Sequence, residues 1–212
     1  QGLAQALADG ALVLDMSSSD PMRTRALSGA LAERDLRLVD APVSGGVKGA
    51  VAASLTIMVG GTDADCAQAD ALLAAMGKAT RTGDVGSGHA LKALNNLLSA
   101  TSMLISSEAI EAGRRFGLAD DVMLDVINRS TGRSWSTEYK WPTFVVPETF
   151  NSGFGLRLLV KDMKIATSLA GELGLPSRLG EAAVELWQQA SDELPADADH
   201  TEIAKVAAHP HD

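Results

Sequence analysis

The sequence has 212 residues, of which 46% are hydrophobic, so it can form one large or two small domains with a sizeable core. A formal net charge of -9 and a pI near 4.9 exclude an extended basic surface, and no nucleic-acid partner is expected. The longest uncharged stretch, residues 93–107, is shorter than the roughly 20 apolar residues of a membrane span, and no secretory signal opens the chain. A single cysteine, Cys66, cannot form an internal disulfide, so we expect a reducing compartment, the cytoplasm.

The first 82 residues alternate short apolar runs with helical patterns, which is typical of an α/β layer with a largely parallel sheet. The expected strands are residues 11–15, 36–40, 55–59 and 79–82. Between the first two, Ser19 or Asp20 can cap a helix that has Pro21 at its first position. A second helix is expected over residues 63–76, with Gly77 supplying a left-handed residue at its C-terminal end.

Strand signals stop after Thr82. Residues 89–116 contain no proline, and apolar residues recur at intervals of three or four, which predicts one long helix that Gly117 ends. Further helices are expected over residues 119–128, 154–173, 177–191 and 200–207, with a loop around Trp141, Pro142 and Pro147, and an exposed turn over residues 194–199. The sequence therefore predicts an α/β domain over residues 1–84 and an all-α domain over residues 85–212, joined by the long helix.

Ser44, Gly45 and Gly46 follow the second predicted strand. Ligands of open α/β sheets bind beyond the carboxyl ends of strands. A hydroxyl group beside unshielded backbone N–H groups suits a carboxylate that must approach the main chain closely. The alternative is an ordinary turn, in which glycines are common.

Lys92, Asn95 and Asn96 are spaced i, i+3 and i+4 in the long predicted helix, which places one cation beside two amides on one face. Amides are poor helix-interior residues, and a pair beside leucines is costly unless both find partners. This pattern indicates a polar site, and a solvated helix face is the alternative. A half-buried Lys92 whose pKa is lowered by desolvation would be a proton donor near neutral pH.

Four segments together resemble motifs of the β-hydroxyacid dehydrogenase family, of the 3-hydroxyisobutyrate dehydrogenase type. In chain order they are DMSSSD (15–20), DAPVSGG (40–46), GHALKALNN (88–96) and FGLRLLVKD (154–162), which together cover nearly the whole chain. The resemblance implies an α/β remnant of a Rossmann-type parallel sheet followed by an all-α domain joined by a long helix. It also implies an NAD(P)-dependent oxidoreductase that interconverts a small β-hydroxyacid and its semialdehyde or keto acid.

The resemblance assigns a role to each residue that matches a motif. It implies that Lys92 is the general acid/base, that the substrate is bound by Ser44, Gly45, Gly46, Asn96 and Asn95, and that NAD or NADP is contacted by Ser18, Phe154, Lys161 and Asp162. It further implies a homodimer or homotetramer that associates through the helical domain. No metal is implied, because the four histidines lack metal-ligand spacing.

The sequence departs from the family pattern at two places. Ala53 and Ser54 stand where the family usually has Gly-Thr, a change expected to affect packing more than chemistry. No GxGxxG turn follows a strand, and residues 1–8 read as a short helix without a strand before it. We therefore expect the glycine-rich first half of the nucleotide-binding domain to be absent, and residues 1–212 alone to bind NAD(P) weakly and to be inactive.

An interpretation of another class remains open, a non-catalytic helical oligomerisation module. The polar face of Lys92, Asn95 and Asn96 distinguishes the two, because a pure interface would not need it. Arg133 could reach a substrate carboxylate, although an exposed loop arginine is the more common case. The three tryptophans are expected as core or interface anchors.

Overall fold

The computed structural model describes residues 2–207, which form two compact units. The first comprises the residues up to Asn95 together with Ser168–Gly174, and the second comprises Asn96–Thr167 and the residues from Leu175 on. The division near Asn95 falls inside one long helix. The boundary after residue 84 therefore stays a prediction of the sequence.

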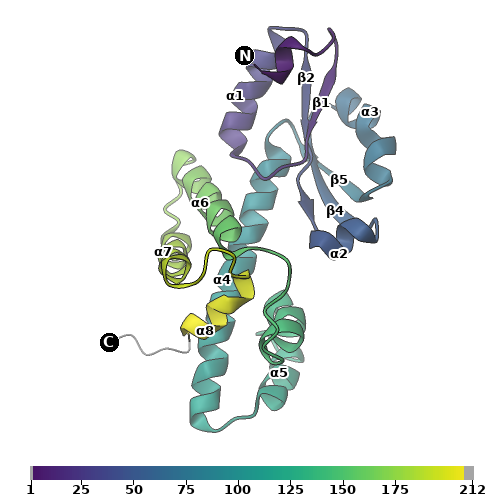
Figure 1. Ribbon diagram of the computed structural model, residues 1–212. Helices are drawn as coiled ribbons and strands as arrows, with labels where there is room; N and C mark the ends of the chain where they lie inside the picture. Colours follow the sequence, from purple (N-terminus) through teal and green to yellow (C-terminus); the bar gives the residue numbers. More distant parts are fainter. Residues whose placement is uncertain (1, 208–212) are drawn as a thin grey trace. The chain divides into compact units, whose positions relative to one another are not determined.

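A five-stranded mixed sheet forms the centre of the first unit (Figure 1). Its strands are β1 (Leu12–Asp15), β2 (Arg37–Asp40), β3 (Val43–Ser44), β4 (Leu55–Gly60) and β5 (Gly77–Gly83), in the order β1-β2-β4-β3 with β5 paired to β4. The β1–β2 and β4–β5 pairs are parallel, whereas β2–β4 and β3–β4 are antiparallel. The expected strands are confirmed, and the two longest strand pairs, β1–β2 and β4–β5, are parallel as expected.

The antiparallel pairs have a physical cause in the short connection between β3 and β4. It contains only the six-residue helix α2 (Gly46–Val51) and a few flanking residues, which is too short for a parallel crossover. The chain therefore reverses and β4 runs back along β3. The two-residue β3 was missed because a period-2 pattern cannot show in so few residues.

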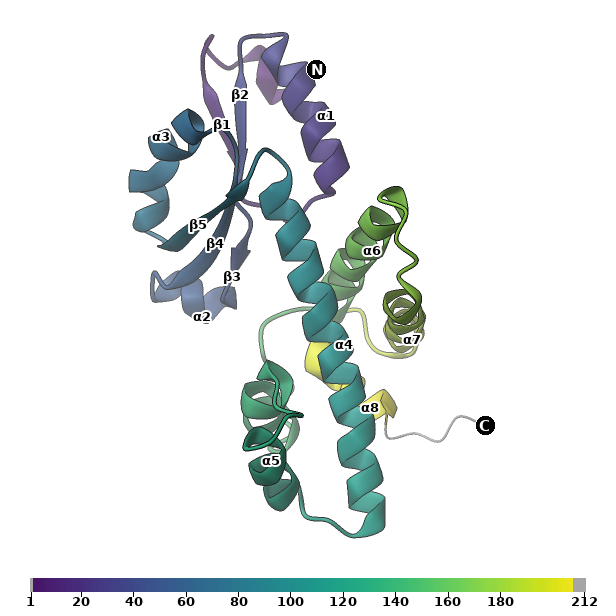
Figure 2. The ribbon, with the colours of Figure 1, turned by 180° about the vertical axis from the view of Figure 1, so that it is seen from behind.

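Helices α1 (Pro21–Ala32) and α3 (Asp63–Ala74) cover opposite faces of this sheet (Figures 1 and 2). Leu31 of α1 packs with Leu36 and Leu38, whereas Leu73 of α3 packs with a second cluster that includes Val39 and Ile57. Side chains alternate between the two faces along β2, as a strand buried on both sides requires. A 3-10 turn, η1 (Leu3–Gln5), precedes β1.

The sequence predicted the N-terminal cap of α1 correctly and the C-terminal cap of α3 incorrectly. Asp20 caps α1 as expected, because its carboxylate accepts hydrogen bonds from the backbone N–H groups of Met22 (2.8 Å) and Arg23 (3.0 Å). Gly77, by contrast, is not the left-handed end of α3 but the first residue of β5. A Cβ atom at this position would collide with the backbone of Leu55, which explains the glycine.

The long helix α4 (Ser87–Phe116) begins against the ends of β2 and β4. A Cβ atom at Gly88 would lie 2.9 Å from the carbonyl oxygen of Asp40 and would collide with that of Met58. Gly86 adopts a φ of 90° and leaves no room for a side chain beside the carbonyl oxygen of Pro21. The Gly-Ser-Gly sequence therefore lets the first turn of α4 approach the sheet closely.

Substituting alanine for Gly88 is expected to lower the free energy of unfolding by about 1–3 kcal/mol, because the added methyl group must displace backbone on several sides. Gly29→Ala is the matched control. Gly29 lies in α1 with open space where a Cβ atom would be, so this variant should be neutral or slightly stabilising. Chemical denaturation measures both, and equal stability of the two variants would contradict the packing argument.

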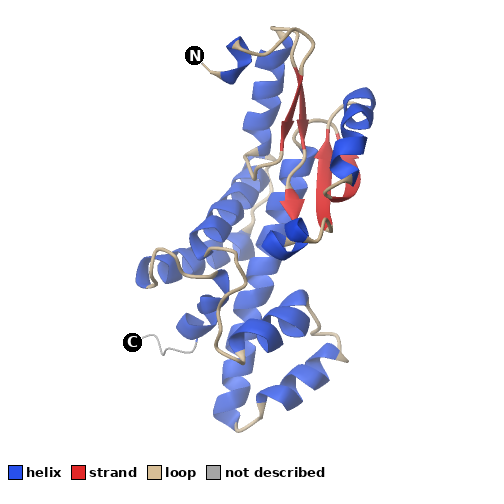
Figure 3. Cartoon of the chain, turned by 45° about the vertical axis from the view of Figure 1, so that its right-hand side comes forward, coloured by secondary structure: helices blue, strands red, loops and turns tan. Residues whose placement is uncertain are grey.

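The second unit is helical, and the described residues after Gly83 contain no strand (Figure 3). It holds most of α4, then α5 (Asp120–Asn128), most of α6 (Leu156–Glu172), α7 (Arg178–Glu193), the 3-10 turn η3 (His200–Glu202) and α8 (Ile203–Ala207). The long helix is confirmed, and Gly117 ends it at a φ of 102°. None of the described helices is both long and apolar enough to be a membrane span.

Residues 136–145 were expected in a loop and instead form the wide helix η2 (Ser136–Val145). Pro142 lies inside it, and the N–H of Val146 donates to the carbonyl oxygen of Trp141, five residues earlier. Proline lacks a backbone donor and clashes with an α-helical turn, so it is normally a sign of a helix break. The wider turn accommodates it, which is why the sequence pattern misled us.

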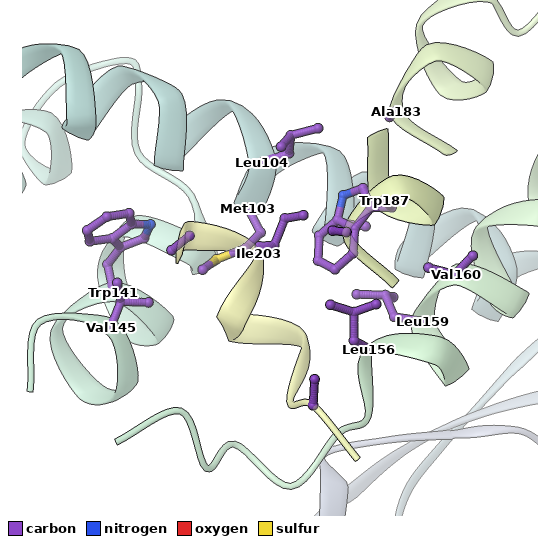
Figure 4. Packing of buried hydrophobic residues seen from close by; sticks show 14 of the residues in the cluster. Met103, Leu104, Trp141, Val145, Leu156, Leu159, Val160, Ala183, Trp187 and Ile203 are labelled. Atoms are coloured by element: carbon purple, nitrogen blue, oxygen red, sulfur yellow. The ribbon is translucent and has the colours of Figure 1, made fainter. Parts of the chain in front are cut away.

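The core of the second unit gathers around α8, as Figure 4 shows. Trp141 and Trp187 are almost completely buried, with Met103 and Ile203 between them (Figure 4). This confirms the prediction of a core position for these two tryptophans. Trp135 is 63% exposed, so of the two expected positions, core or interface, it does not occupy the core, and a place in an interface stays a prediction.

Candidate active site

Two loops of the first unit leave the sheet at the same edge, since β1 and β2 run parallel and Asp15 pairs with Asp40. After β1, the Asp15 carboxylate Oδ1 accepts a hydrogen bond from the N–H of Ser17 at 2.9 Å and so fixes a tight turn. Ser18 follows directly and is half-buried. The predicted cofactor contact therefore lies on an ordered turn at the carboxyl end of a parallel strand, where open α/β sheets bind ligands.

Asp40 ends β2 and is completely buried. Its two carboxylate oxygens accept hydrogen bonds from the backbone N–H groups of Gly86 (2.7 Å) and His89 (2.8 Å) at the beginning of α4. A carboxylate at a helix N-terminus satisfies donors that have no partner within the helix and interacts favourably with the helix dipole. Asp40 thereby anchors the helix that carries Lys92.

Ser44, Gly45 and Gly46 do not follow β2 directly, because the buried Ala41 and Pro42 intervene. Ser44 ends β3, Gly45 follows it with a φ of 130°, and Gly46 begins α2 with a φ of 60°. Both glycines are exposed, and nothing lies within 4 Å of a Cβ atom built at Gly46. Both glycines have a positive φ, which glycine adopts most readily, and a carboxylate site at this loop stays a prediction.

The structure places the three polar residues of α4 in different environments. Lys92 is half-buried, Asn95 is exposed, and Asn96 is only 6% exposed. Their spacing in a regular helix still puts Lys92 and Asn96 one turn apart on one face. Because Asn96 is buried, this helix face is not simply solvated, which was the alternative interpretation.

Within the second unit, Asn96 donates a hydrogen bond from Nδ2 to Asp162 Oδ2 at 2.6 Å. Asp162 is 1% exposed, and the Lys161 ammonium lies 3.0 Å from its Oδ1, an ion-pair contact without hydrogen-bond alignment. A carboxylate can only accept, so this bond fixes which end of the amide points toward Asp162. The structure thus brings together Asn96, Asp162 and Lys161, which the sequence had assigned from separate motifs.

Phe154 precedes α6 and contacts the segment of Asp199 and His200. The sequence analysis did not predict these contacts. Its carbonyl oxygen accepts from the N–H of His200 (2.9 Å), and its ring meets the imidazole edge-on at a centroid distance of 5.7 Å. Asp199 Oδ2 accepts from Ser152 Oγ (2.8 Å) and from the N–H of Gly153 (3.0 Å). The expected exposed turn over residues 194–199 is therefore wrong at its end, where Asp199 is buried and forms a capping box with Glu202.

Lys140, on η2, is a second buried lysine that the sequence analysis did not single out. It is 7% exposed and donates a hydrogen bond from Nζ to Ser99 Oγ at 2.8 Å. Burial lowers the pKa of Lys140 to about 8. Burial and the Lys140 ammonium lower the pKa of the neighbouring His200 to about 4. Burial alone would raise the pKa of Asp199, but hydrogen bonds from Thr201 and Ser152 bring it below its usual range.

This buried ammonium makes the stability of the second unit depend on pH. A pKa of about 8 in the folded protein, against an ordinary value of 10.5, corresponds to about 3 kcal/mol. Between these two pH values the unfolded chain binds more protons, so stability should rise with pH. Lys140→Met should therefore be more stable than the parent at pH 7, and the difference should shrink toward pH 10.5. Urea denaturation tests this, with the exposed Lys164→Met as control, and a pH-independent difference would contradict it.

Arg133 is an exposed, ion-paired side chain, and the described histidines form no metal site. The Arg133 side chain is 62% exposed and pairs with Glu138 at 3.1 Å, so it is an exposed arginine, the more common of the two cases. The described residues contain no group of three or more His, Cys, Asp or Glu side chains that could hold a metal ion. His209 and His211 lie outside the described residues.

Comparison with protein-family models finds two consecutive matches along the chain. Residues 1–86 match the NAD binding domain of 6-phosphogluconate dehydrogenase, and residues 86–207 match the model described as NAD-binding of NADP-dependent 3-hydroxyisobutyrate dehydrogenase. The junction between them lies at Gly86, where α4 begins. The second match covers more than half of the chain.

Curated relatives include 2-(hydroxymethyl)glutarate dehydrogenase of Eubacterium barkeri and mitochondrial 3-hydroxyisobutyrate dehydrogenase of Drosophila melanogaster. The first is 36% identical over 88% of this chain and the second 38% identical over 85%. The chain spans only 62% and 58% of these relatives' own lengths.

Solved structures give the same result. The chain is similar to Mycobacterium tuberculosis 3-hydroxyisobutyrate dehydrogenase with L-serine, with a TM-score of 0.91 and 29% identity over 97% of this chain and 73% of that one. It is also similar to Psf3 in complex with NADP+ and 2-OPP, with a TM-score of 0.85 and 26% identity over 97% of this chain and 72% of that one. The match of the family model over residues 86–207 and these relatives show that the chain belongs to the β-hydroxyacid dehydrogenase family.

Proposed function

We propose that the chain is the substrate-handling and proton-transferring part of an NAD(P)-dependent dehydrogenase that interconverts a small β-hydroxyacid and its semialdehyde or keto acid. When bound, the nicotinamide exchanges a hydride with the carbon that carries the hydroxyl group. The residues of this chain bind the acid, orient its hydroxyl group and move the hydroxyl proton. The printed names of the relatives support this reaction class.

Lys92 is the proposed general acid/base. In the direction of oxidation its neutral amine takes the hydroxyl proton while the C–O bond becomes a carbonyl, and in reduction its ammonium returns that proton. Its half-buried position one turn from the buried Asn96 supports this role. Asn96 would orient the substrate hydroxyl group, since its hydrogen bond to Asp162 fixes the orientation of the amide.

The carboxylate of the substrate is assigned to the loop of Ser44, Gly45 and Gly46, with Asn95 beside Asn96 as a further contact. The open backbone at the two glycines supports this assignment. A carboxylate held at one end and a hydroxyl group held at the other would present the reacting carbon in one orientation, which is the main contribution that a protein makes to such a transfer.

The residues present fit the nicotinamide end of NAD or NADP better than its pyrophosphate. Ser18 offers a hydroxyl group on a turn fixed by Asp15 at the carboxyl edge of a parallel pair. Phe154 and Lys161, with Asp162, are the further proposed contacts. No GxGxxG turn occurs in these residues, so we derive no pyrophosphate contact from them.

The observation that carries the proposal is the buried hydrogen bond between Asn96 and Asp162. A buried amide and carboxylate are costly in a helix packing surface unless they serve a polar site, so the pair weighs against the alternative of a purely structural oligomerisation module.

The direct test is a spectrophotometric assay at 340 nm of a protein that joins residues 1–212 to a glycine-rich nucleotide-binding half. Small β-hydroxyacids, with and without a second carboxylate, are offered with NAD+ and NADP+. Matched α-hydroxyacids are the controls. Turnover of a β-hydroxyacid supports the proposal, and turnover of α-hydroxyacids alone would contradict the substrate class.

We also propose that the chain forms a homodimer or homotetramer through its helices. The helix α4 exposes Leu91, Leu94, Leu98 and Ile105, of which Leu98 is 73% exposed. A row of exposed apolar side chains on one helix is unusual for a monomer. Leu98→Glu should lower the mass measured by light scattering toward that of a monomer, with Leu72→Glu on α3 as the control. A monomeric parent protein would contradict the proposal.

The cytoplasm remains our proposed location. Cys66 is a free, buried cysteine, which fits a reducing compartment. The Drosophila relative is named as a mitochondrial protein, so fractionation of cells that produce the whole protein is the measurement that decides between the two.

A further inference from the structure

His89 occupies an unusual position in the first turn of α4. Its side chain is completely buried between β1, β2 and α1. Thr24 Oγ1 of α1 lies 2.8 Å from His89 Nδ1, and Asp40 Oδ2 lies 3.9 Å from the same nitrogen. Asp15 Oδ2 lies 4.0 Å from Nε2 on the other side of the ring. A buried position that served packing alone would not need an imidazole between two carboxylates.

The neighbours of the ring determine where the neutral imidazole holds its proton. The Thr24 hydroxyl group lies 2.9 Å from the carbonyl oxygen of Asp20, which can only accept. Because a hydroxyl group has one proton, Thr24 donates to Asp20 and accepts from His89 Nδ1. The neutral ring is therefore protonated at Nδ1.

This assignment leaves Nε2 in an unfavourable position. The atom is buried and has no hydrogen-bond partner among the described residues. In the neutral ring with its proton on Nδ1, Nε2 is an acceptor and cannot donate to the Asp15 carboxylate 4.0 Å away. In the imidazolium the same atom is an N–H donor, and a movement of about 1 Å would complete a charge-assisted hydrogen bond. The Asp15 side chain is 28% exposed, so it has room to move.

Asp15 connects this ring to the turn after β1, since its other oxygen accepts from the N–H of Ser17. We propose that His89 is a positioning residue: protonation at Nε2 draws Asp15 toward the ring and sets the turn of Ser17 and Ser18. The consequence for catalysis depends on the proposed function, which assigns the cofactor contact to Ser18. The coupling of His89 to the turn does not depend on the proposed function.

The charged groups on α1 and α4 that lie nearest to His89 in the sequence and in the hydrogen-bond network are Arg25 and Lys92. Arg25 of α1 donates to the carbonyl oxygen of Val85, and Lys92 follows His89 by three residues on α4. Arginine stays charged at any pH used here, but a lysine with a lowered pKa could titrate in the same range. The test therefore includes Lys92→Met.

The experiment is an NMR titration of the 212-residue protein from pH 5 to 8, with ¹⁵N spectra of the imidazole and of the backbone. We expect the neutral His89 to be the Nδ1–H form, and the amide resonances of Ser17 and Ser18 to shift with the same midpoint as His89. Both amide responses should be lost in His89→Gln and Asp15→Asn and kept in Lys92→Met. Asp70→Asn, an exposed carboxylate on α3, is the control that should keep them.

Amide resonances that ignore the titration of His89, or a neutral ring protonated at Nε2, would overturn the inference. If His89→Gln does not fold, Asp15→Asn still decides, because Asp15 is partly exposed and an asparagine oxygen can still accept from Ser17. In the assay of the joined protein, the Asp15→Asn variant should raise the KM for the cofactor more than it lowers kcat. Coupling without any dehydrogenase activity would leave this inference standing and refute only the proposed function.

Discussion

Replacing Lys92 by alanine is expected to lower kcat by about 10²–10⁴-fold, the usual contribution of a general acid/base. The loss should fall on kcat more than on the KM of the acid, because the substrate carboxylate is assigned to Ser44 and the two glycines after it. Lys92→Arg should be nearly as slow, since a guanidinium does not give up its proton near neutral pH. The assay is hydride transfer at 340 nm in the joined protein.

The control for this prediction is Lys78→Ala. Lys78 is exposed on β5 in the same unit as Lys92, and its loss should leave kcat unchanged. The pH dependence of kcat supplies an independent readout. The limb of this profile that reports the general base should disappear in Lys92→Ala and remain in Lys78→Ala. Near-normal turnover in Lys92→Ala would refute the proposed mechanism.

Asp40→Ala is expected to lower the free energy of unfolding of the first unit by about 2–6 kcal/mol. The substitution leaves the buried N–H groups of Gly86 and His89 without their acceptor, at about 1–3 kcal/mol for each. It also removes a carboxylate from the N-terminus of α4, where negative charge is stabilising. Urea denaturation followed by circular dichroism measures the loss.

Hydrogen exchange at the start of α4 separates this local effect from general destabilisation, since the N–H groups of Gly86 and His89 should lose protection first. Asp40→Asn keeps one oxygen acceptor and should retain part of the stability. Asp70→Ala, on an exposed position of α3, is the control and should be close to neutral. An Asp40→Ala protein as stable as this control would show that Asp40 does not anchor α4.

The sequence by itself determined the elements whose signals are local. Periodicity over a long window identified α4, and Asp20 with Pro21 identified the beginning of α1, because caps and apolar spacing act within a few residues. The motifs that resemble the family are also short stretches of sequence, and they identified the polar residues of the proposed site. The structure shows a buried hydrogen bond between Asn96 and Asp162 that the motifs did not predict, and the roles of these residues and of Lys92 stay predictions.

Only the tertiary structure decided features that depend on partners distant in the chain. Gly77 has the local pattern of a helix end, but the backbone of Leu55 across the sheet makes it a strand residue. Asp199 looks like a loop residue until its contacts with Ser152 show it buried. The pKa of Lys140 is lowered to about 8, although no sequence pattern singled this residue out, because desolvation depends on what surrounds a side chain and sequence spacing does not contain that information.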